Sequence, residues 1–348
     1  MEPRKVELRG IPMNRRRFLR AAGASAGTQR GVRERFRVVD AHVHVFNSGV
    51  QGANGIPRYY PDSTVEMQIE KMNRGHVDKA FLISYNAEDV AAEIRRRGQD
   101  PVLLKAVANK QYQLRSWTKY KDRFWWFTDH VSPIRETYLE DLVRDLDAGA
   151  SGVKLLPIFH GLLADHPGWL PVYEICRKRR KPVVLDLSWW YFGQYELANE
   201  SVERRKLSST FKIFADYAAL LDPFFARFPD VPISLAHCGT ARNKNDYPDI
   251  FDFLKRHPNI SCDLGMISDY NAAFLERLIK VIGAGRVMYG TDAPYWFKGL
   301  DSYRNGRFRW TVIADECPFL NDKQKQMILA GNAERFVKFE LPQRGGLT

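Results

Sequence analysis

The sequence has few cysteines and no long apolar run, and each absence excludes a class of protein. Its four cysteines are Cys176, Cys238, Cys262 and Cys317, and no two have the spacing of a zinc finger. We therefore expect reduced thiols in a large core rather than a disulfide scaffold. No run of about 18 apolar residues occurs, so we expect no stable membrane insertion.

Negative charge is also scarce, but the deficit is local. The net charge is +12, and residues 1–37 contribute +8 of it through eleven Lys and Arg against three Glu. The remaining 311 residues carry only +4. Because the charge after residue 37 is nearly balanced, we expect no nucleic-acid partner.

Residues 1–36 form a basic N-terminal segment that is set apart from the fold. Arg15-Arg16-Arg17-Phe18-Leu19 resembles a twin-arginine export signal and is followed by small residues, Ala21 to Gly27. Charged residues from Arg30 onward interrupt the apolar stretch earlier than a signal requires. A signal and a solvated basic tail both stay open. We expect a periplasmic location if the signal is functional and a cytoplasmic one otherwise.

From residue 37 to 342, short apolar and β-branched runs alternate with amphipathic stretches. Eight runs begin near Arg37, Val77, Arg123, Ser151, Pro182, Val231, Asn259 and Arg286. Several are continuously apolar, as in strands buried on both faces. Helices are predicted between them, for example over 136–148, 170–180, 246–256 and 271–282. This alternation predicts an α/β fold, a single-domain (β/α)8 TIM barrel, with 343–348 as a C-terminal tail.

Two connections are unusually long. They run from 46 to 62 and from 189 to 230, and the second is long enough to contain helices of its own. Both follow strands, so we expect them on the barrel face where active sites lie.

His42 and His44 lie two residues apart in the first predicted strand. A period of two places both imidazoles on one face, where they can hold a metal ion. Asp292 follows the last strand, which closure of the barrel brings next to the first. The alternatives are a hydrogen-bonded pair of core histidines and, for Asp292, a helix N-cap.

Two further polar residues end apolar strands. His237 ends the sixth run and is a candidate for metal binding or proton transfer. Asp186 lies in the fifth run, where a carboxylate needs a partner. That partner is a metal ion, Lys154 on the neighbouring strand, or a backbone donor.

Taken together, these motifs resemble a known family. They are His42-x-His44, Gly152-Val153-Lys154, Leu235-Ala236-His237, Tyr289-Gly290-Thr291-Asp292 and Ile328 to Ala333. The set resembles the amidohydrolase superfamily, in particular the branch that includes aminocarboxymuconate semialdehyde decarboxylase. The resemblance implies that His42, His44 and Asp292 bind metal, that Asp292 also takes a water proton, and that His237 polarises substrate or moves protons. The family usually has a strand-five histidine where this chain has Asp186, which we predict as a replacement ligand.

The resemblance implies one divalent metal ion, zinc in the first instance and manganese as the alternative. The expected activity is that of a metal-dependent hydrolase that uses a metal-activated water. Two alternatives stay open. One is a metal-dependent decarboxylase of an aromatic or unsaturated acid, and the other is a metal-free lactonase or binding barrel.

Aromatic and basic residues follow the strands and indicate a substrate class. The predicted substrate-binding residues are Arg58, Trp189, Trp190, Arg242 and Trp296. A binding site lined by aromatic and basic side chains suits a small aromatic or carboxylate-bearing molecule. Alternatively, these aromatics pack the loops together or form a subunit contact. Homodimers are common in families of this kind.

Overall fold

The structure is a computed structural model that describes residues 36–46, 64–84, 110–129, 132–187, 197–240, 246–267, 270–294 and 308–343. The chain divides between Phe36 and Arg37 into two compact units. The description below concerns the second unit. The twin-arginine-like motif and the tail residues 344–348 lie outside the described residues.

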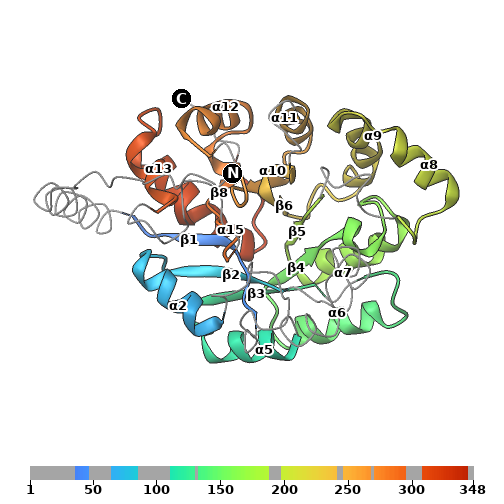
Figure 1. Cartoon of the computed structure of the whole chain (residues 1–348), viewed down its shortest axis with the longest axis horizontal. Coiled ribbons are helices and arrows are strands. Elements are labelled where there is room, and N and C mark those ends of the chain that lie inside the picture. Colours follow the sequence, from blue (N-terminus) through green and yellow to red (C-terminus); the bar gives the residue numbers. More distant parts are fainter. Residues whose placement is uncertain are drawn as a thin grey trace, which may run out of the picture. The chain divides into compact units, whose positions relative to one another are not determined.

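In the described residues, eight parallel strands form one sheet in chain order (Figure 1). They are β1 (Val39–Val43), β2 (Lys79–Ile83), β3 (Phe124–Thr128), β4 (Gly152–Leu155), β5 (Val183–Leu185), β6 (Ile233–Leu235), β7 (Ile260–Asp263) and β8 (Val287–Met288). All eight coincide with the predicted apolar runs. The prediction of a (β/α)8 barrel is confirmed.

The sheet closes where β1 meets β8 and the residues that follow it. The Ala41 amide donates to the Tyr289 carbonyl at 2.8 Å, and the Asp292 amide donates to the His42 carbonyl at 2.8 Å. These contacts join the first strand of the sheet to the last. We call residues 39–44 and 287–293 the β1–β8 seam. Closure therefore brings Asp292 next to the histidines of β1.

The register between β1 and β2 shifts by one residue. Asp40 pairs with Ala80, whereas Val43 pairs with Leu82, so β1 contains one residue more than its partner between these points. Such a bulge changes which way the side chains on the strand point, and bulges are common beside active sites. His42 lies inside the bulge.

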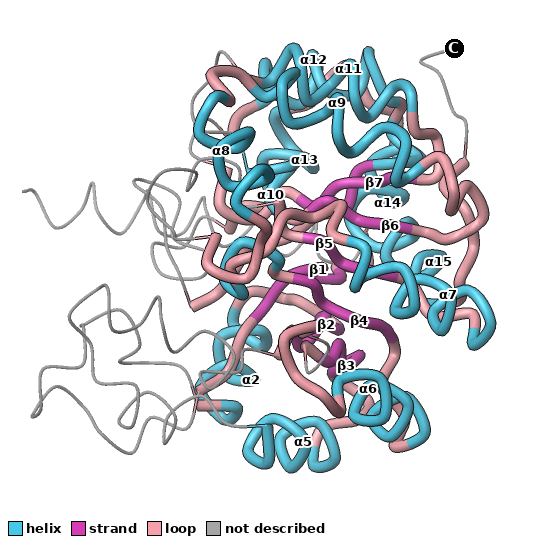
Figure 2. The backbone as a smooth tube through the Cα atoms, turned by 90° about the vertical axis from the view of Figure 1, so that its right-hand side faces the viewer, coloured by secondary structure: helices cyan, strands magenta, loops and turns pink. Residues whose placement is uncertain are grey.

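Helices surround the strands, and the two views agree that α9, α11 and α12 lie on the opposite side of the barrel from α2, α5 and α6 (Figure 2). The helices are α2 (Val65–Arg74), α5 (Lys110–Lys119), α6 (Tyr138–Asp147), α7 (Leu170–Arg179), α8 (Val202–Thr210), α9 (Phe214–Phe225), α10 (His237–Thr240), α11 (Tyr247–Arg256), α12 (Ala272–Ile282), α13 (Trp310–Glu316), α14 (Asp322–Gln326) and α15 (Asn332–Val337). The second long connection contains α8 and α9, as predicted. No described helix has the length and apolar character needed to cross a membrane.

Helix α12 shows why the amphipathic stretches fold as they do. The side chain of Asn271 caps the helix by accepting from the Phe274 amide. The buried residues recur at helical spacing and form one apolar face: Phe274, Leu275, Leu278, Ile279 and Ile282. Gly283, with φ of 81°, ends the helix in a conformation that favours glycine.

Apolar side chains fill the core of the barrel. The Phe81 and Phe127 rings pack with centroids 4.7 Å apart, and Phe336 of α15 stacks on both of them. These rings belong to one buried cluster that also contains Val184 and Met288. The barrel is therefore a packed core and not a pore, which leaves the strand ends for chemistry. The four cysteines are buried and unpaired.

Candidate metal centre

The side chains predicted to carry chemistry gather at the carboxyl ends of the strands. His42 lies in β1 and His44 just beyond it, Asp186 directly follows β5, His237 follows β6, and Asp292 follows β8. All five are buried. The carboxyl ends of barrel strands are the place where active sites of this fold are built.

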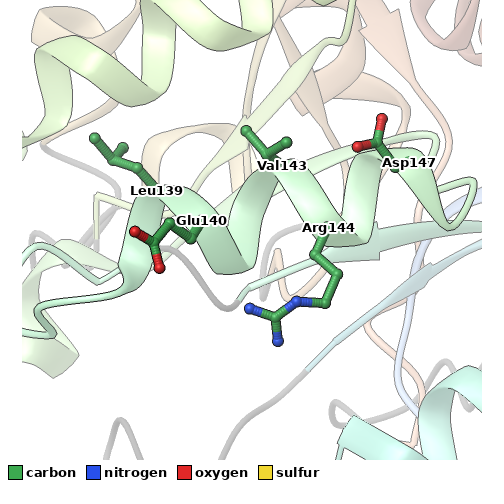
Figure 3. Close-up of a pocket in the computed structure, with 5 residues that line it drawn as sticks. All are labelled: Leu139, Glu140, Val143, Arg144 and Asp147. Carbon is green, nitrogen blue, oxygen red and sulfur yellow. The ribbon is translucent and has the colours of Figure 1, made fainter.

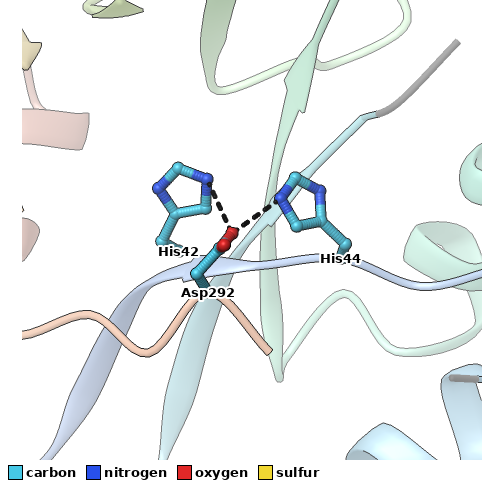
Figure 4. A group of neighbouring side chains, drawn as sticks. All are labelled: His42, His44 and Asp292. Atoms are coloured by element: carbon cyan, nitrogen blue, oxygen red, sulfur yellow. Dashed lines mark hydrogen bonds and ion pairs between the residues drawn. The ribbon is translucent and has the colours of Figure 1, made fainter. Parts of the chain in front are cut away.

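His42, His44 and Asp292 form a compact triad (Figure 4). Asp292 Oδ1 lies 3.0 Å from His44 Nε2 and 3.4 Å from His42 Nε2. One ligand atom from each residue lies within 4.8 Å of the other two. Two imidazole nitrogens and one carboxylate oxygen thus point toward a common centre.

The outer nitrogens of both rings face acceptors. His42 Nδ1 lies 3.0 Å from Asp263 Oδ2, and His44 Nδ1 lies 3.1 Å from the Ile83 carbonyl oxygen. Each Nδ1 therefore carries a proton and donates it, so Nε2 is the nitrogen that faces the centre of the triad. The triad therefore fits a metal ion.

The charge states agree with this geometry. Burial, together with the positive charge of Lys154, lowers the pKa of His42 well below its usual value, so this ring is neutral at pH 7. Burial raises the pKa of Asp292, but His237, His44 and His42 lower it by more, and the net shift is downward. A neutral imidazole and an ionised carboxylate are the forms that bind metal.

Asp263, the last residue of β7, is a site residue that the sequence reasoning missed. Besides facing His42 through Oδ2, it accepts through Oδ1 from the His237 amide at 3.1 Å and the Gly265 amide at 2.9 Å. It also forms a second group of potential ligands with His42 and His237. The signal was present, because Asp263 is an acid in a predicted apolar run, just as Asp186 is.

His237 lies in a tight turn. It has φ of 56°, the following Cys238 has φ of 50°, and Gly239 has φ of 82°. Non-glycine residues in this left-handed region are strained, and such strain is concentrated at functional sites. Asp292 also has a positive φ, of 60°. The turn stacks the His237 ring on His42, with centroids 4.5 Å apart.

Asp186 does not join the triad. Its Oδ2 lies 3.8 Å from Lys154 Nζ and 3.6 Å from His237 Nε2. Among the described residues, it belongs to neither group whose ligand atoms meet within 4.8 Å. Asp186 thus lies beside both Lys154 and His237, and its assignment as a metal ligand stays a prediction.

Asp40 supports the triad from the seam. Its Oδ1 accepts from the Thr291 amide at 2.9 Å and from the His42 amide at 3.1 Å, and its Oδ2 accepts from Thr291 Oγ1 at 2.6 Å. One buried carboxylate thus fixes the residue before Asp292 and the backbone of His42. The sequence reasoning had not singled out Asp40 either.

The structure does not describe the five predicted substrate-binding residues. Arg58, Trp189, Trp190, Arg242 and Trp296 all lie outside the described residues. Their assignment to the substrate stays a prediction.

A depression on the described surface lies over α6, away from the triad residues. It has a volume of about 480 Å³ and is lined by Leu139, Glu140, Val143, Arg144 and Asp147, all from α6 (Figure 3). None of the triad residues lines it. We therefore assign the chemistry to the triad and not to this depression.

Solved structures that share the fold include three enzymes from bacteria. A probable 2-pyrone-4,6-dicarboxylic acid hydrolase from Acinetobacter baumannii matches with a TM-score of 0.56 and 15% identity, covering 87% of this chain and 99% of its own. A 5-carboxyvanillate decarboxylase from Novosphingobium aromaticivorans, solved with manganese, matches with a TM-score of 0.58 and 15% identity, covering 87% and 96%. A 4-oxalomesaconate hydratase from Rhodopseudomonas palustris matches with a TM-score of 0.57 and 18% identity, covering 87% and 96%.

At these identities the structures establish the fold alone. None of the curated proteins compared with the chain matches it. The model of the amidohydrolase family, in contrast, matches residues 39–339, which include all eight strands and the triad. The chain therefore belongs to the amidohydrolase family.

Proposed function

We propose that the protein is a metal-dependent hydrolase acting on a small aromatic or carboxylate-bearing molecule. The observation that carries this proposal is the convergence of His42 Nε2, His44 Nε2 and Asp292 Oδ1 in a buried site. Both Nδ1 atoms are engaged by acceptors, so the site is preorganised for a cation.

His42, His44 and Asp292 would hold one divalent ion. Zinc is our first assignment because two imidazole nitrogens and one carboxylate oxygen suit it, and manganese is the alternative. When bound, such an ion lowers the pKa of a water molecule and polarises the bond under attack.

The chain's own residues then handle protons. Asp292 uses Oδ1 toward the two histidines, so we assign Oδ2 as the atom that accepts a proton from the attacking water. His237 Nε2, which faces Asp186 Oδ2 at 3.6 Å, is assigned to deliver a proton to the leaving group.

Decarboxylation of an aromatic or unsaturated acid is the second candidate. The same three ligands serve it, and His237 lies close enough to the triad to protonate the carbon that loses CO₂. The decarboxylase with manganese among the structures of similar fold supports it.

The test begins with metal content. The protein would be expressed with zinc or manganese supplied and its bound metal measured by elemental analysis. We expect about one ion per chain in the wild type, and its loss in His44→Ala. His257→Ala is the matched control, because this buried histidine pairs with Asp222 at 2.7 Å and does not belong to the triad. A wild type without metal would favour the metal-free lactonase or binding barrel.

The second step separates the two reactions. Aromatic carboxylates and lactones would be assayed for release of CO₂ and for release of acid. Acid release alone supports hydrolysis, and stoichiometric CO₂ supports decarboxylation. Turnover that persists after complete removal of metal would contradict both metal-dependent assignments.

A further inference from the structure

Lys154 places a buried positive charge inside the candidate site. It is the third residue of β4, and its side chain is only 1% exposed. Its Nζ lies 3.5 Å from His42 Nε2 and 3.8 Å from Asp186 Oδ2. The ammonium thus lies between a triad residue of β1 and the carboxylate that follows β5.

These two contacts leave most of the ammonium's hydrogen-bonding capacity unused. An ammonium has three N–H donors, and its hydrogen bonds to charged acceptors are normally about 2.7–2.9 Å long. Within the part of the chain that the structure describes, Lys154 has no closer polar contact. A buried charge is costly unless it is paired and hydrogen-bonded. The missing acceptors point to a ligand.

The ring of His237 also has a nitrogen without a hydrogen-bond partner among the described residues. That nitrogen, Nδ1, is buried. The closest carboxylate oxygen, Asp263 Oδ1, lies 3.8 Å away, beyond hydrogen-bond length. Lys154 Nζ and His237 Nδ1, at the same strand ends, therefore both lack a hydrogen-bond partner at normal distance among the described residues.

We propose that Lys154 binds the carboxylate of the substrate, which makes the substrate class a small organic acid. An oxygen accepting from Lys154 Nζ would lie beside His42 Nε2, and thus beside the ion that the proposed function assigns to the triad. The inference rests on that proposed function for the reaction, but not for the binding of the acid. Asp186 holds the ammonium in place and competes with the ligand for it.

Binding of unreactive acids tests this assignment without turnover. Benzoate, isophthalate and glutarate would be titrated into the protein by calorimetry, with their amides as uncharged probes. We expect at least one acid to bind, and Lys154→Met to weaken it by about 30-fold or more while amide binding stays the same. Asp186→Asn removes the internal competitor and should tighten acid binding by about fivefold.

Two controls keep the result independent of folding. Lys325→Met removes another buried lysine, whose Nζ donates to the Ala314 carbonyl at 2.6 Å, and should leave acid binding unchanged. Lys154→Cys, alkylated with 2-bromoethylamine, restores an ammonium at nearly the same position and should recover binding. Because position 154 is as buried as the native cysteines, the alkylation is carried out in urea before refolding, and wild type treated in the same way controls for modification of the native cysteines.

The outcomes separate the two proposals. If Lys154→Met binds the acids as tightly as the wild type, or if the wild type binds none of them, the assignment of Lys154 is wrong even where the metal is bound. If the wild type holds no metal yet loses acid binding in Lys154→Met, the metal-dependent function fails and the assignment of Lys154 stands.

Discussion

Asp263 Oδ2 lies 3.0 Å from His42 Nδ1, so a carboxylate on β7 orients an imidazole on β1. The same carboxylate accepts the His237 amide through its other oxygen at 3.1 Å. A single side chain therefore positions both a triad histidine and the proton-transfer histidine. Its removal should affect the two together.

Asp263→Asn should weaken metal binding by about 10- to 100-fold. An amide presents only one acceptor oxygen, so it cannot serve both the His42 ring and the two backbone amides. The measurement is a zinc titration against a chelator of known affinity. Asp252→Asn, an exposed position on α11, is the matched control. Equal affinities for both variants would show that Asp263 does not orient His42.

Without metal, stability should fall as the pH falls below about 6.5. His42 has a pKa well below that value in the folded protein because it is buried and close to Lys154. The unfolded chain then binds a proton that the folded protein does not, which costs at most about 1.4 kcal/mol per pH unit. Asp292, whose pKa is also lowered, adds to this loss only below about pH 4.

Urea unfolding of the metal-free protein at pH 7.5, 6.5 and 5.5 measures this dependence. His42→Gln removes the titrating group and should flatten the curve between these values. An unchanged slope in the variant would assign the effect to other groups.

Gly265→Ala should displace His237. A β-carbon at this position would lie 2.9 Å from His237 Nδ1 and 3.0 Å from Asp263 Oδ1. Overpacking of this kind costs about 1–3 kcal/mol, and turnover should fall because the ring moves. Gly331→Ala, whose added carbon meets nothing closer than 3.7 Å, should be nearly neutral. Urea unfolding and kcat measure the two effects, and equal behaviour of the variants would contradict the prediction.

Asp40→Ala should destabilise the barrel by about 2–4 kcal/mol, because it leaves three buried donors at the β1–β8 seam without their acceptor. A double-mutant cycle with Thr291→Val isolates the pair that Asp40 Oδ2 forms with Thr291 Oγ1. We expect a coupling energy of about 1 kcal/mol or more from denaturant unfolding. Additive effects would mean that this hydrogen bond does not stabilise the seam.

The fold could be predicted because burial determines its local patterns. Strands enclosed on both faces are mostly apolar, as Val183–Leu185 and Ala80–Ile83 show. Helices such as α12 bury one face and expose the other, which gives them a clear period.

The site could be predicted only in part. His42, His44 and Asp292 stood out because their position at the seam follows from barrel closure alone. Asp40 and Asp263 were missed because which way a strand carboxylate points depends on register and bulges, and β1 changes register near Asp40. The pairing of Asp186 with Lys154 likewise depends on distances between side chains that no spacing encodes.

The position of the triad across the β1–β8 seam has a mechanical consequence. An ion held by His42 and Asp292 would cross-link the first strand to the segment that follows the last one, although the two residues are 250 positions apart in the chain. Amide hydrogens along this join, such as those of Ala41 and Asp292, should then exchange with deuterium more slowly once the ion is bound. Metal binding would thus slow the local unfolding that separates β1 from β8.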